Sequence, residues 1–183
     1  MTGVQTCALP ICADIRRYGT YGELAALLGA SLSEQPWDAV VHSAAVSDYR
    51  LAGGRYDGKI ESDGPLDLRL EKNPKLLDSI KPQARAAGYP EPFLVAFKLS
   101  SGADERAAES IVAAYLDKAD RVLWNDASAL DMAARPFILF GPPSDGPGSS
   151  SPPLAVARGD GNPALAAAIL GAAEAAASAR ETP

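Results

Sequence analysis

Residues 43–50 (SAAVSDYR) combine side-chain types that can hold a phosphorylated ligand, and they directly follow a short apolar run. The small side chains at the start of this segment would let a ligand approach the main chain, whose N–H groups can bind phosphate or carboxylate oxygens. The carboxylate of Asp48 can accept hydrogen bonds from ribose hydroxyls or help to hold a magnesium ion. A strand end followed by a solvated aspartate and a turn fits the same pattern, so both interpretations stay open.

Two further segments carry a lysine and a helix-start signal. Lys59 lies in a glycine-rich segment, residues 53–64, where a lysine is most often simply solvated. Asn73 and Pro74 are residue types favoured at the N-cap and the first position of a helix, so we expect a helix from this point through Ile80. The free N–H groups and the positive dipole end of that helix would then be available to an anion at Pro74.

Three more residues stand in or after apolar runs. Asn125 follows the run at 122–124, and its amide has both the donor and the acceptor needed to read a base edge or to orient a loop. Phe97, within the apolar segment 93–99, is by itself more typical of a core aromatic residue. His42 is the only histidine, and its place inside an apolar run favours a packed residue over a catalytic base.

Apolar periodicity predicts the helices and strands that position these residues. The first apolar strand is interpreted as a central parallel strand that is buried on both faces. Strands that alternate with helices indicate an α/β protein, a three-layer α/β/α Rossmann-like sandwich with a mostly parallel sheet, which binds ligands beyond the carboxyl ends of its strands. The expected helices are 21–32 with Thr20 as cap, 73–80, 104–118 and one opening at 162, and the expected strands are 37–46, 66–70, 93–99, 122–124, 136–140 and 154–157.

Composition and charge exclude two classes of partner. Of the 183 residues, 47% are hydrophobic and 22% are charged, which fits one soluble globular domain. The formal net charge of -6 and the lack of a Lys/Arg cluster argue against a nucleic-acid surface, so an anionic ligand must be held locally. No apolar run approaches the roughly 20 residues that span a bilayer, so we expect no membrane segment and a cytoplasmic location.

The first twelve residues (MTGVQTCALPIC) differ in character from the rest of the chain. They hold both cysteines and resemble the translation of a sequencing-library adapter, so we interpret residues 1–12 as a non-native leader. The natural chain would then continue upstream of Ala13. We expect a single α/β domain over residues 13–178, which lacks its N-terminal phosphate-binding segment, and a short tail at 179–183.

Four segments together resemble the phosphopantothenoylcysteine synthetase family. They occur in the family's order within about residues 37–130, roughly half of the chain, and the set is far more specific than any single motif. Residues 44–49 are similar to AAV-[AS]-D-[WYF], and 73–77 (NPKLL) to N-P-x-[IL]-L. Residues 93–101 resemble a strand that ends in GFxxET or SFKLET, and 118–126 (KADRVLWND) resemble K-x-x-D-x-[IV]-[VA]-x-N-[DI].

The resemblance implies a ligase that joins cysteine to 4'-phosphopantothenate. CTP or ATP, with Mg²⁺, would activate the carboxylate as an acyl nucleotidylate, and the cysteine amine would then displace the nucleotide. It also implies a homodimer, no protein nucleophile, no assigned metal ligand, and a catalytic Lys59 on a flexible strap that closes over the site. The implied nucleotide-binding residues are Ala44, Asp48, Lys59, Pro74, Lys75, Leu76, Leu77, Phe97, Lys118 and Asn125, and the implied substrate-binding residues are Ala44, Ala45 and Asp48.

The chain departs from the family pattern at several positions. Neither a Gly-rich strand–turn–helix nor an N-x-SSG segment stands before Tyr21, so we expect the chain to be inactive by itself. Bacterial members often carry KxKK where this chain has Lys59 followed by Ile60, Glu61 and Ser62. Ala114 stands in the place of a second helix lysine. The choice between CTP and ATP therefore stays open.

Two other functions, a nucleotide-binding module and a serine hydrolase, fit the sequence less well. A nucleotide-binding α/β module without ligase activity fits the expected parallel sheet, although no GxGxxG motif is present. A serine hydrolase is disfavoured because no G-x-S-x-G motif occurs. The sequence leaves open whether a flavin-dependent decarboxylase is fused upstream.

Overall fold

The computed structural model describes residues 14–54, 58–60, 64–129, 135–146 and 149–181, so the predicted leader lies outside the described residues. The helices are α1 (Tyr21–Glu34), α2 (Leu77–Ala86), α3 (Glu105–Leu116) and α4 (Gly161–Glu181), with a 3₁₀ turn η1 (Ala127–Ala129). The strands are β1 (Ala39–His42), β2 (Tyr49–Leu51), β3 (Leu70–Lys72), β4 (Phe93–Ser100), β5 (Arg121–Asp126), β6 (Pro136–Gly141) and β7 (Leu154–Asp160).

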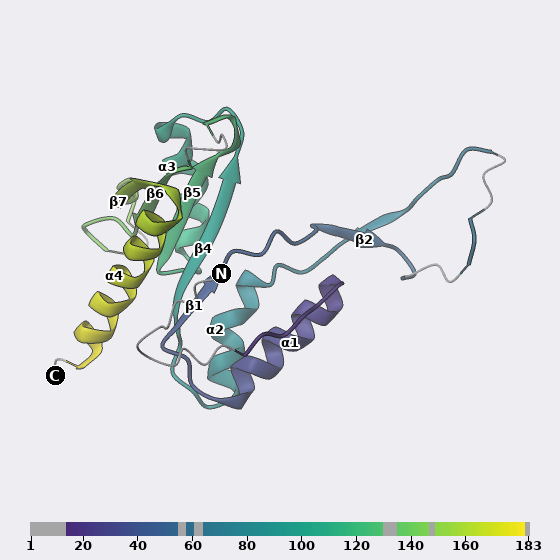
Figure 1. The fold of residues 1–183 in the computed structure, drawn as a ribbon, viewed down its shortest axis with the longest axis horizontal. Coiled ribbons are helices and arrows are strands. Elements are labelled where there is room, and N and C mark those ends of the chain that lie inside the picture. The colour runs from purple at the N-terminus through teal and green to yellow at the C-terminus, as the bar shows by residue number, and fades with distance from the viewer. Residues whose placement is uncertain (1–13, 55–57, 61–63, 130–134, 147–148, 182–183) are drawn as a thin grey trace, which may run out of the picture.

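Five of the strands form the central sheet, in the order β1-β4-β5-β6-β7. Strand β4 pairs in parallel with β1 and with β5, whereas β6 runs antiparallel to both of its neighbours. Four of the five strands therefore point in one direction. Helix α4 lies on one side of this sheet, and α1, α2 and α3 belong to the other (Figure 1). This arrangement confirms the predicted three-layer α/β sandwich with a mostly parallel sheet.

Strand β4 shows how the sequence builds both layers of the core. Its side chains alternate between the two faces of the sheet, as the period of two in a strand requires. Phe93 and Val95 pack on the face of α4, whereas Leu94 and Ala96 pack on the face of α2 and α3. All four are buried, and burial of an aliphatic side chain of this size contributes roughly 1.5–3 kcal/mol. This buried strand, predicted over 93–99, is confirmed and extends to Ser100.

The start of α1 follows from its local sequence. The Thr20 hydroxyl accepts a hydrogen bond from the main-chain N–H of Glu23, and the Glu23 carboxylate accepts one from the N–H of Thr20. This capping box satisfies two donors that a helix start leaves free. The helix predicted from Tyr21, with Thr20 as its cap, is confirmed.

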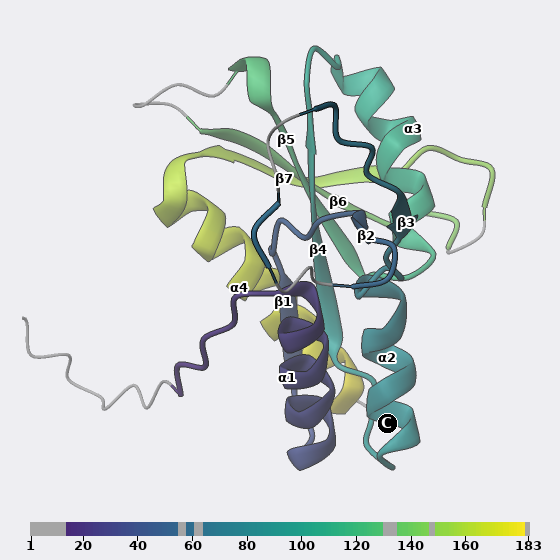
Figure 2. The ribbon, with the colours of Figure 1, turned by 90° about the vertical axis from the view of Figure 1, so that its right-hand side faces the viewer.

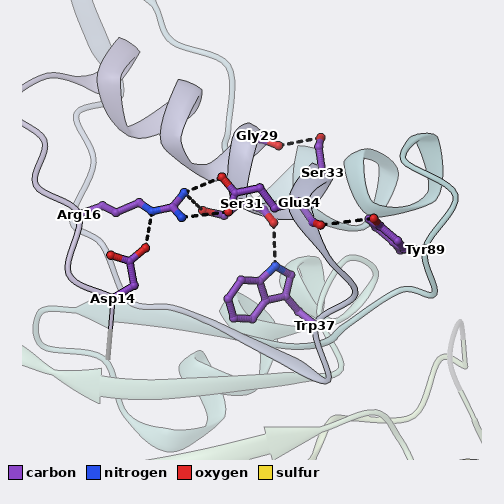
Figure 3. A network of polar contacts seen from close by, with 8 residues as sticks. All are labelled: Asp14, Arg16, Gly29, Ser31, Ser33, Glu34, Trp37 and Tyr89. Carbon is purple, nitrogen blue, oxygen red and sulfur yellow. Dashed lines mark hydrogen bonds and ion pairs between the residues drawn. The ribbon is translucent and has the colours of Figure 1, made fainter. Parts of the chain in front are cut away.

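A polar network fastens the C-terminal end of α1 to the segments on both sides of it (Figure 3). The Arg16 guanidinium pairs with the carboxylates of Asp14, at 2.7 Å, and Glu34, at 2.9 Å. The indole N–H of Trp37 donates to the main-chain oxygen of Ser31, at 2.8 Å. These groups are exposed, so the network orients the chain into β1 and contributes little to stability.

The prediction of a central first strand, buried on both faces, is wrong. Strand β1 covers only residues 39–42 and lies at the edge of the sheet, where β4 is its sole partner among the described strands. Val41 is 46% exposed for this reason. Its apolar residues meet a neighbouring strand on one side only, and the chain leaves the strand geometry at Ser43.

The alternating leucines of residues 66–70 do not form the predicted half-buried strand. Strand β3 begins at Leu70 and pairs with β2 in a separate two-stranded ribbon, which projects away from the body of the molecule in Figure 1 and points toward the viewer in Figure 2. Leu66, Leu68 and Leu70 are each more than half exposed. The period of two therefore has no core to face within the described part of the chain.

None of the described helices is both long and apolar enough to cross a membrane.

Candidate functional site

A small cavity lies between the carboxyl end of β1, the middle of β4 and the start of α2. Its volume is about 130 Å³. It brings together seven of the residues that the sequence predicted for a ligand site: Ala44, Asp48, Pro74, Lys75, Leu76, Leu77 and Phe97. The other lining residues are Tyr21, His42, Val46, Ser47, Ala96 and Tyr115. We call this space the Asp48 cavity.

Asn73 connects the two loops that line the Asp48 cavity. Its side chain is buried, at 3% exposure, and its amide donates to the main-chain oxygen of Ser47 at 2.9 Å. The amide oxygen accepts from the Arg50 guanidinium at 3.0 Å, and the main-chain N–H of Asn73 donates to the oxygen of Asp48 at 2.8 Å. The segment after β1 and the segment before α2 are thus tied together at the residues that carry the predicted ligand groups.

The predicted start of the second helix at Asn73 and Pro74 is wrong. Helix α2 begins at Leu77, and Leu76 occupies the N-cap position without any side-chain hydrogen bond to the helix. The amide of Asn73 is used by the Ser47 loop, so it cannot cap a helix. In the first turn of α2 the main-chain N–H groups of Asp78 and Ser79 donate to the oxygens of Lys75 and Leu76, at 3.2 and 2.9 Å, so they are not free for an anion. The positive dipole end of this helix lies one turn later in the chain than the sequence predicted.

One ion pair lies beside the Asp48 cavity. The Lys75 ammonium contacts the Asp48 carboxylate, and both side chains are about half exposed. Lys75 holds the pKa of Asp48 below its ordinary value, and Lys72 and Lys98 act in the same direction at longer range. Asp48 in turn raises the pKa of Lys75. Both groups are therefore charged at neutral pH, and either can exchange its partner for a group of a ligand.

His42 and Tyr21 line the same cavity, although the sequence did not mark them as site residues. His42 is half-buried, and burial lowers its pKa, so its imidazole is neutral near pH 7. Because His42 lines the cavity, its side chain is partly open to this space rather than fully enclosed in the core. The Tyr21 hydroxyl donates to the main-chain oxygen of Pro74 at 2.8 Å and fixes α1 against the segment before α2. No local signal could have found either residue, because tertiary packing alone brings them here.

A second cavity of about 630 Å³ lies on the other face of the sheet, against α4. Phe97 lines this cavity as well as the Asp48 cavity. Asn125 lines only the second one, where its amide donates to the main-chain oxygen of Pro136 at 2.7 Å. The structure thus places two predicted nucleotide ligands, Asp48 and Asn125, on different sides of Phe97. The other lining residues are Val41, Ser43, Arg135, Asn162, Leu165, Ala166, Ile169 and Leu170.

Three predicted site residues line neither of these two cavities. Lys118 pairs instead with Asp78, in the first turn of α2, at 2.7 Å. Ala45 belongs to the segment between β1 and β2. Lys59 belongs to the segment between β2 and β3, the ribbon that leads away from the sheet (Figure 1).

Asp126 is a polar residue whose role the sequence did not reveal. Its carboxylate is buried at the carboxyl end of β5 and accepts hydrogen bonds from the main-chain N–H groups of Gly102 and Ala103, at 3.0 and 2.9 Å. The hydroxyls of Ser100 and Ser128 also donate to it. These hydrogen bonds lower the pKa of Asp126 strongly, and the one from Ser128 has the largest effect. Asp126 therefore fixes the turn between β4 and α3.

The chemistry of the Asp48 cavity suits a phosphorylated ligand with hydroxyl groups. Its described lining includes the ammonium of Lys75, the carboxylate of Asp48 and aromatic side chains. No group of three or more His, Cys, Asp or Glu residues that could hold a metal ion occurs within the residues that the structure describes. One carboxylate is nevertheless enough for Mg²⁺, which proteins often bind through one or two carboxylates together with the phosphates of a substrate.

Comparison with known proteins identifies related sequences. Residues 14–135 match the family described as DNA/pantothenate metabolism flavoprotein C-terminal domain. The coenzyme A biosynthesis bifunctional protein CoaBC of Thermococcus kodakarensis is 33% identical over 124 residues, which make up 67% of this chain and 29% of that protein. The CoaBC protein of Methanocaldococcus jannaschii is 30% identical over 70 residues, or 38% of this chain and 16% of that protein. The chain spans less than a third of the length of either relative.

A solved structure shares the fold. The crystal structure of the DNA/pantothenate metabolism flavoprotein from Streptococcus pneumoniae superposes with a TM-score of 0.63 at 18% sequence identity. The similarity covers 89% of this chain and 72% of that one. At this identity the likeness concerns the arrangement of helices and strands alone.

Proposed function

This chain belongs to the DNA/pantothenate metabolism flavoprotein family, in the C-terminal domain that its residues 14–135 match, and from that premise we propose that it acts in coenzyme A biosynthesis. More specifically, we propose that it is the nucleotide-handling part of a phosphopantothenate–cysteine ligase. The observation that supports this most is the Asp48 cavity, which gathers Ala44, residues 46–48, residues 74–77 and Phe97 from three separate segments. Each of these segments carries one of the motifs that resemble the synthetases.

The proposed reaction has two steps. The carboxylate of 4'-phosphopantothenate attacks the α-phosphate of CTP or ATP, which releases pyrophosphate and leaves an acyl nucleotidylate. The amine of cysteine then displaces the nucleotide. No protein nucleophile is required, so the protein acts by positioning the reactants and by stabilising negative charge at phosphorus.

Different residues would position the reactants and stabilise the negative charge. Lys75 and the positive dipole end of α2 are suited to attract phosphate oxygens, because both present positive charge to the cavity. The aromatic ring of Phe97, which packs on the α4 face of the sheet, would offer a surface for the base or its ribose from the second cavity. Ala44 and Ala45 leave the main chain accessible to substrate, and Asn73 keeps their loop in place through Ser47.

Asp48 is the residue that would hold Mg²⁺, since no other carboxylate among the described residues lines the cavity. A bound Mg²⁺ would neutralise charge on the phosphates of the nucleotide. Asp48 must exchange its contact with Lys75 for that role, which frees the ammonium for a phosphate oxygen.

Lys59 completes the proposal as the lysine that reaches the reacting phosphate. Its segment leads away from the cavity in this structure, so its role requires the β2–β3 ribbon to fold over the site. The Asp48 cavity is also smaller than the roughly 300–1,000 Å³ of most ligand sites. We therefore propose that residues 14–181 by themselves bind nucleotide without completing the reaction, and that the active form is a homodimer of the complete protein.

The test uses the complete gene product, obtained by reading the source locus through the codons before Ala13. We expect it to release pyrophosphate from CTP or ATP when 4'-phosphopantothenate is added, and to form phosphopantothenoylcysteine when cysteine follows. In the Lys59→Gln variant we expect the first step to slow while the melting temperature stays the same. If neither nucleotide yields pyrophosphate, the ligase assignment fails and a nucleotide-binding module remains.

A further inference from the structure

Several lysine side chains lie near the Asp48 carboxylate. Lys72, Lys75 and Lys98 all act electrostatically on Asp48. Glu71, next to Lys72, is paired with Arg50 at 2.8 Å. Asp78, which acts electrostatically on Lys75, is paired with Lys118 at 2.7 Å.

Lys98 is the member of this group that was not predicted as a site residue, although it falls on the lysine of the SFKLET pattern. It lies two residues after Ala96, which lines the cavity, and so belongs to the same face of β4, roughly 7 Å further along the strand. Among the described residues Lys98 has no ion-pair partner. Its ammonium lies over the ring of Tyr115, 5.5 Å from the ring centre, and Tyr115 itself lines the cavity.

Tyr115 therefore holds a positive charge at the cavity without neutralising it. A cation over an aromatic face is attracted by the ring electrons, yet it keeps its N–H groups for another acceptor. A carboxylate partner would instead compete with an anionic ligand, as Asp48 does at Lys75. Lys98 is thus oriented and still able to bind an anion.

We propose that Lys98, held over Tyr115, is a second anion-binding residue of the Asp48 cavity and acts with Lys75 on a phosphate group of the ligand. This inference deepens the proposed function and rests on it for the identity of the ligand. Two phosphates have the required chemistry: the polyphosphate of the nucleotide and the 4'-phosphate of the pantothenate substrate. In either case Lys75 leaves Asp48 to bind the phosphate, whereas Lys98 is available from the start.

The experiment measures the binding of inorganic pyrophosphate to the 183-residue chain by calorimetry at low ionic strength. We expect Lys98→Met to weaken binding about tenfold, which corresponds to about 1.4 kcal/mol. Lys98→Arg should restore most of the affinity, because it keeps the charge and can stack on the ring. Arg85→Met, which removes an exposed positive charge from the last turn of α2, is the matched control and should bind within about twofold of the unaltered protein. Tyr115→Leu removes the aromatic face and should weaken binding as Lys98→Met does.

Two results would overturn the inference. One is a Lys98→Met variant that binds pyrophosphate as tightly as the unaltered protein, and the other is an unaltered protein that does not bind pyrophosphate. Thermal melts of each variant separate a loss of binding from a loss of folding, and Tyr115→Leu provides an independent test if Lys98→Met does not fold.

The same titrations with CTP, ATP and 4'-phosphopantothenate identify the phosphate. A loss confined to the nucleotides assigns Lys98 to the polyphosphate, and a loss confined to 4'-phosphopantothenate assigns it to the substrate. If Lys98→Met weakens pyrophosphate binding although none of the three compounds binds, the anion site stands and the proposed ligase function fails.

Discussion

The substitution Asn73→Asp tests whether the buried amide of Asn73 organises the candidate site. Asp has nearly the same shape as Asn, but it cannot donate to the Ser47 oxygen that the amide contacts at 2.9 Å. Two acceptor oxygens would then face each other in a buried position, at 3% exposure. A buried acceptor left without its partner costs about 1–3 kcal/mol. The new carboxylate would also attract the Arg50 guanidinium electrostatically. Because the Arg50 side chain is half exposed, this attraction offsets less than about 1 kcal/mol of the loss in stability.

We therefore expect Asn73→Asp to reduce the free energy of unfolding by about 1–2 kcal/mol. For a chain of this size each kcal/mol lowers the melting temperature by roughly 2–4 °C, so the expected loss is about 2–8 °C. The two tryptophans, Trp37 and Trp124, report unfolding by fluorescence in thermal and urea titrations. Pyrophosphate binding should weaken in the same variant, because the loop of Asp48 loses its attachment.

Glu71→Gln is the matched control for this substitution. It removes the exposed ion pair with Arg50, at 2.8 Å, while the hydrogen bond between Asn73 and Ser47 stays intact. The expected change in stability is less than about 0.5 kcal/mol. If Asn73→Asp is as stable as Glu71→Gln, the buried amide does not hold the loop and the account of the site given above is incorrect.

Two further predictions concern the stability of the fold. Hydrogen bonds to the Asp126 carboxylate, above all the one from Ser128, lower the pKa of this group in the folded protein. The ionised carboxylate therefore stabilises the fold above about pH 4, the ordinary pKa of aspartate in an unfolded chain. This stabilisation is lost as the pH falls toward the lower pKa of the folded state. Urea midpoints at about pH 5 and about pH 3 should therefore differ less in Asp126→Asn than in the unaltered protein, and an equal difference would contradict this. Gly159→Ala would place a methyl group 2.8 Å from the ring of Phe137, so we expect a loss of about 1–3 kcal/mol in thermal melts. Gly171 lies in α4, and a methyl group added there would meet no atom within 4 Å, so Gly171→Ala should stabilise the fold by roughly 0.5–1 kcal/mol. Equal effects of the two substitutions on stability would refute the packing argument.

Local signals predicted the elements whose ends are set by nearby residues. Thr20 and Glu23 form the capping box of α1, and Asp104 caps α3 through the N–H of Ala107. The buried strand at 93–99 was predictable because a continuous apolar run of that length suits a strand covered on both faces. These features depend on residues a few positions apart, which a pattern along the sequence can capture.

Features that depend on distant partners could not be predicted in this way. The apolar run before Ser43 fits a central strand and an edge strand equally well, and only the sheet order decides between them. Asn73 has the residue type of a helix cap, but its amide bonds to a loop 26 positions earlier in the chain. Lys98 and Tyr115 are 17 positions apart and meet only because α3 packs beside β4.

For the site itself, the sequence located most of the residues but not the side of the sheet on which each one lies. Ala44, Asp48 and residues 74–77 were predicted to lie at one ligand site, and the structure places them around one cavity. The separation of Asn125 from Asp48 by the sheet was not predictable, because the direction of a side chain depends on the register of its strand. The roles of Lys59 and Lys118 stay predictions.

Phe97 forms part of the wall of both cavities, one on each face of the sheet. Its side chain packs on the α4 face of the sheet, as those of Phe93 and Val95 do, so the ring itself belongs to the side of the second cavity. A ligand in the Asp48 cavity and a ligand in the second cavity would therefore meet opposite sides of the same strand.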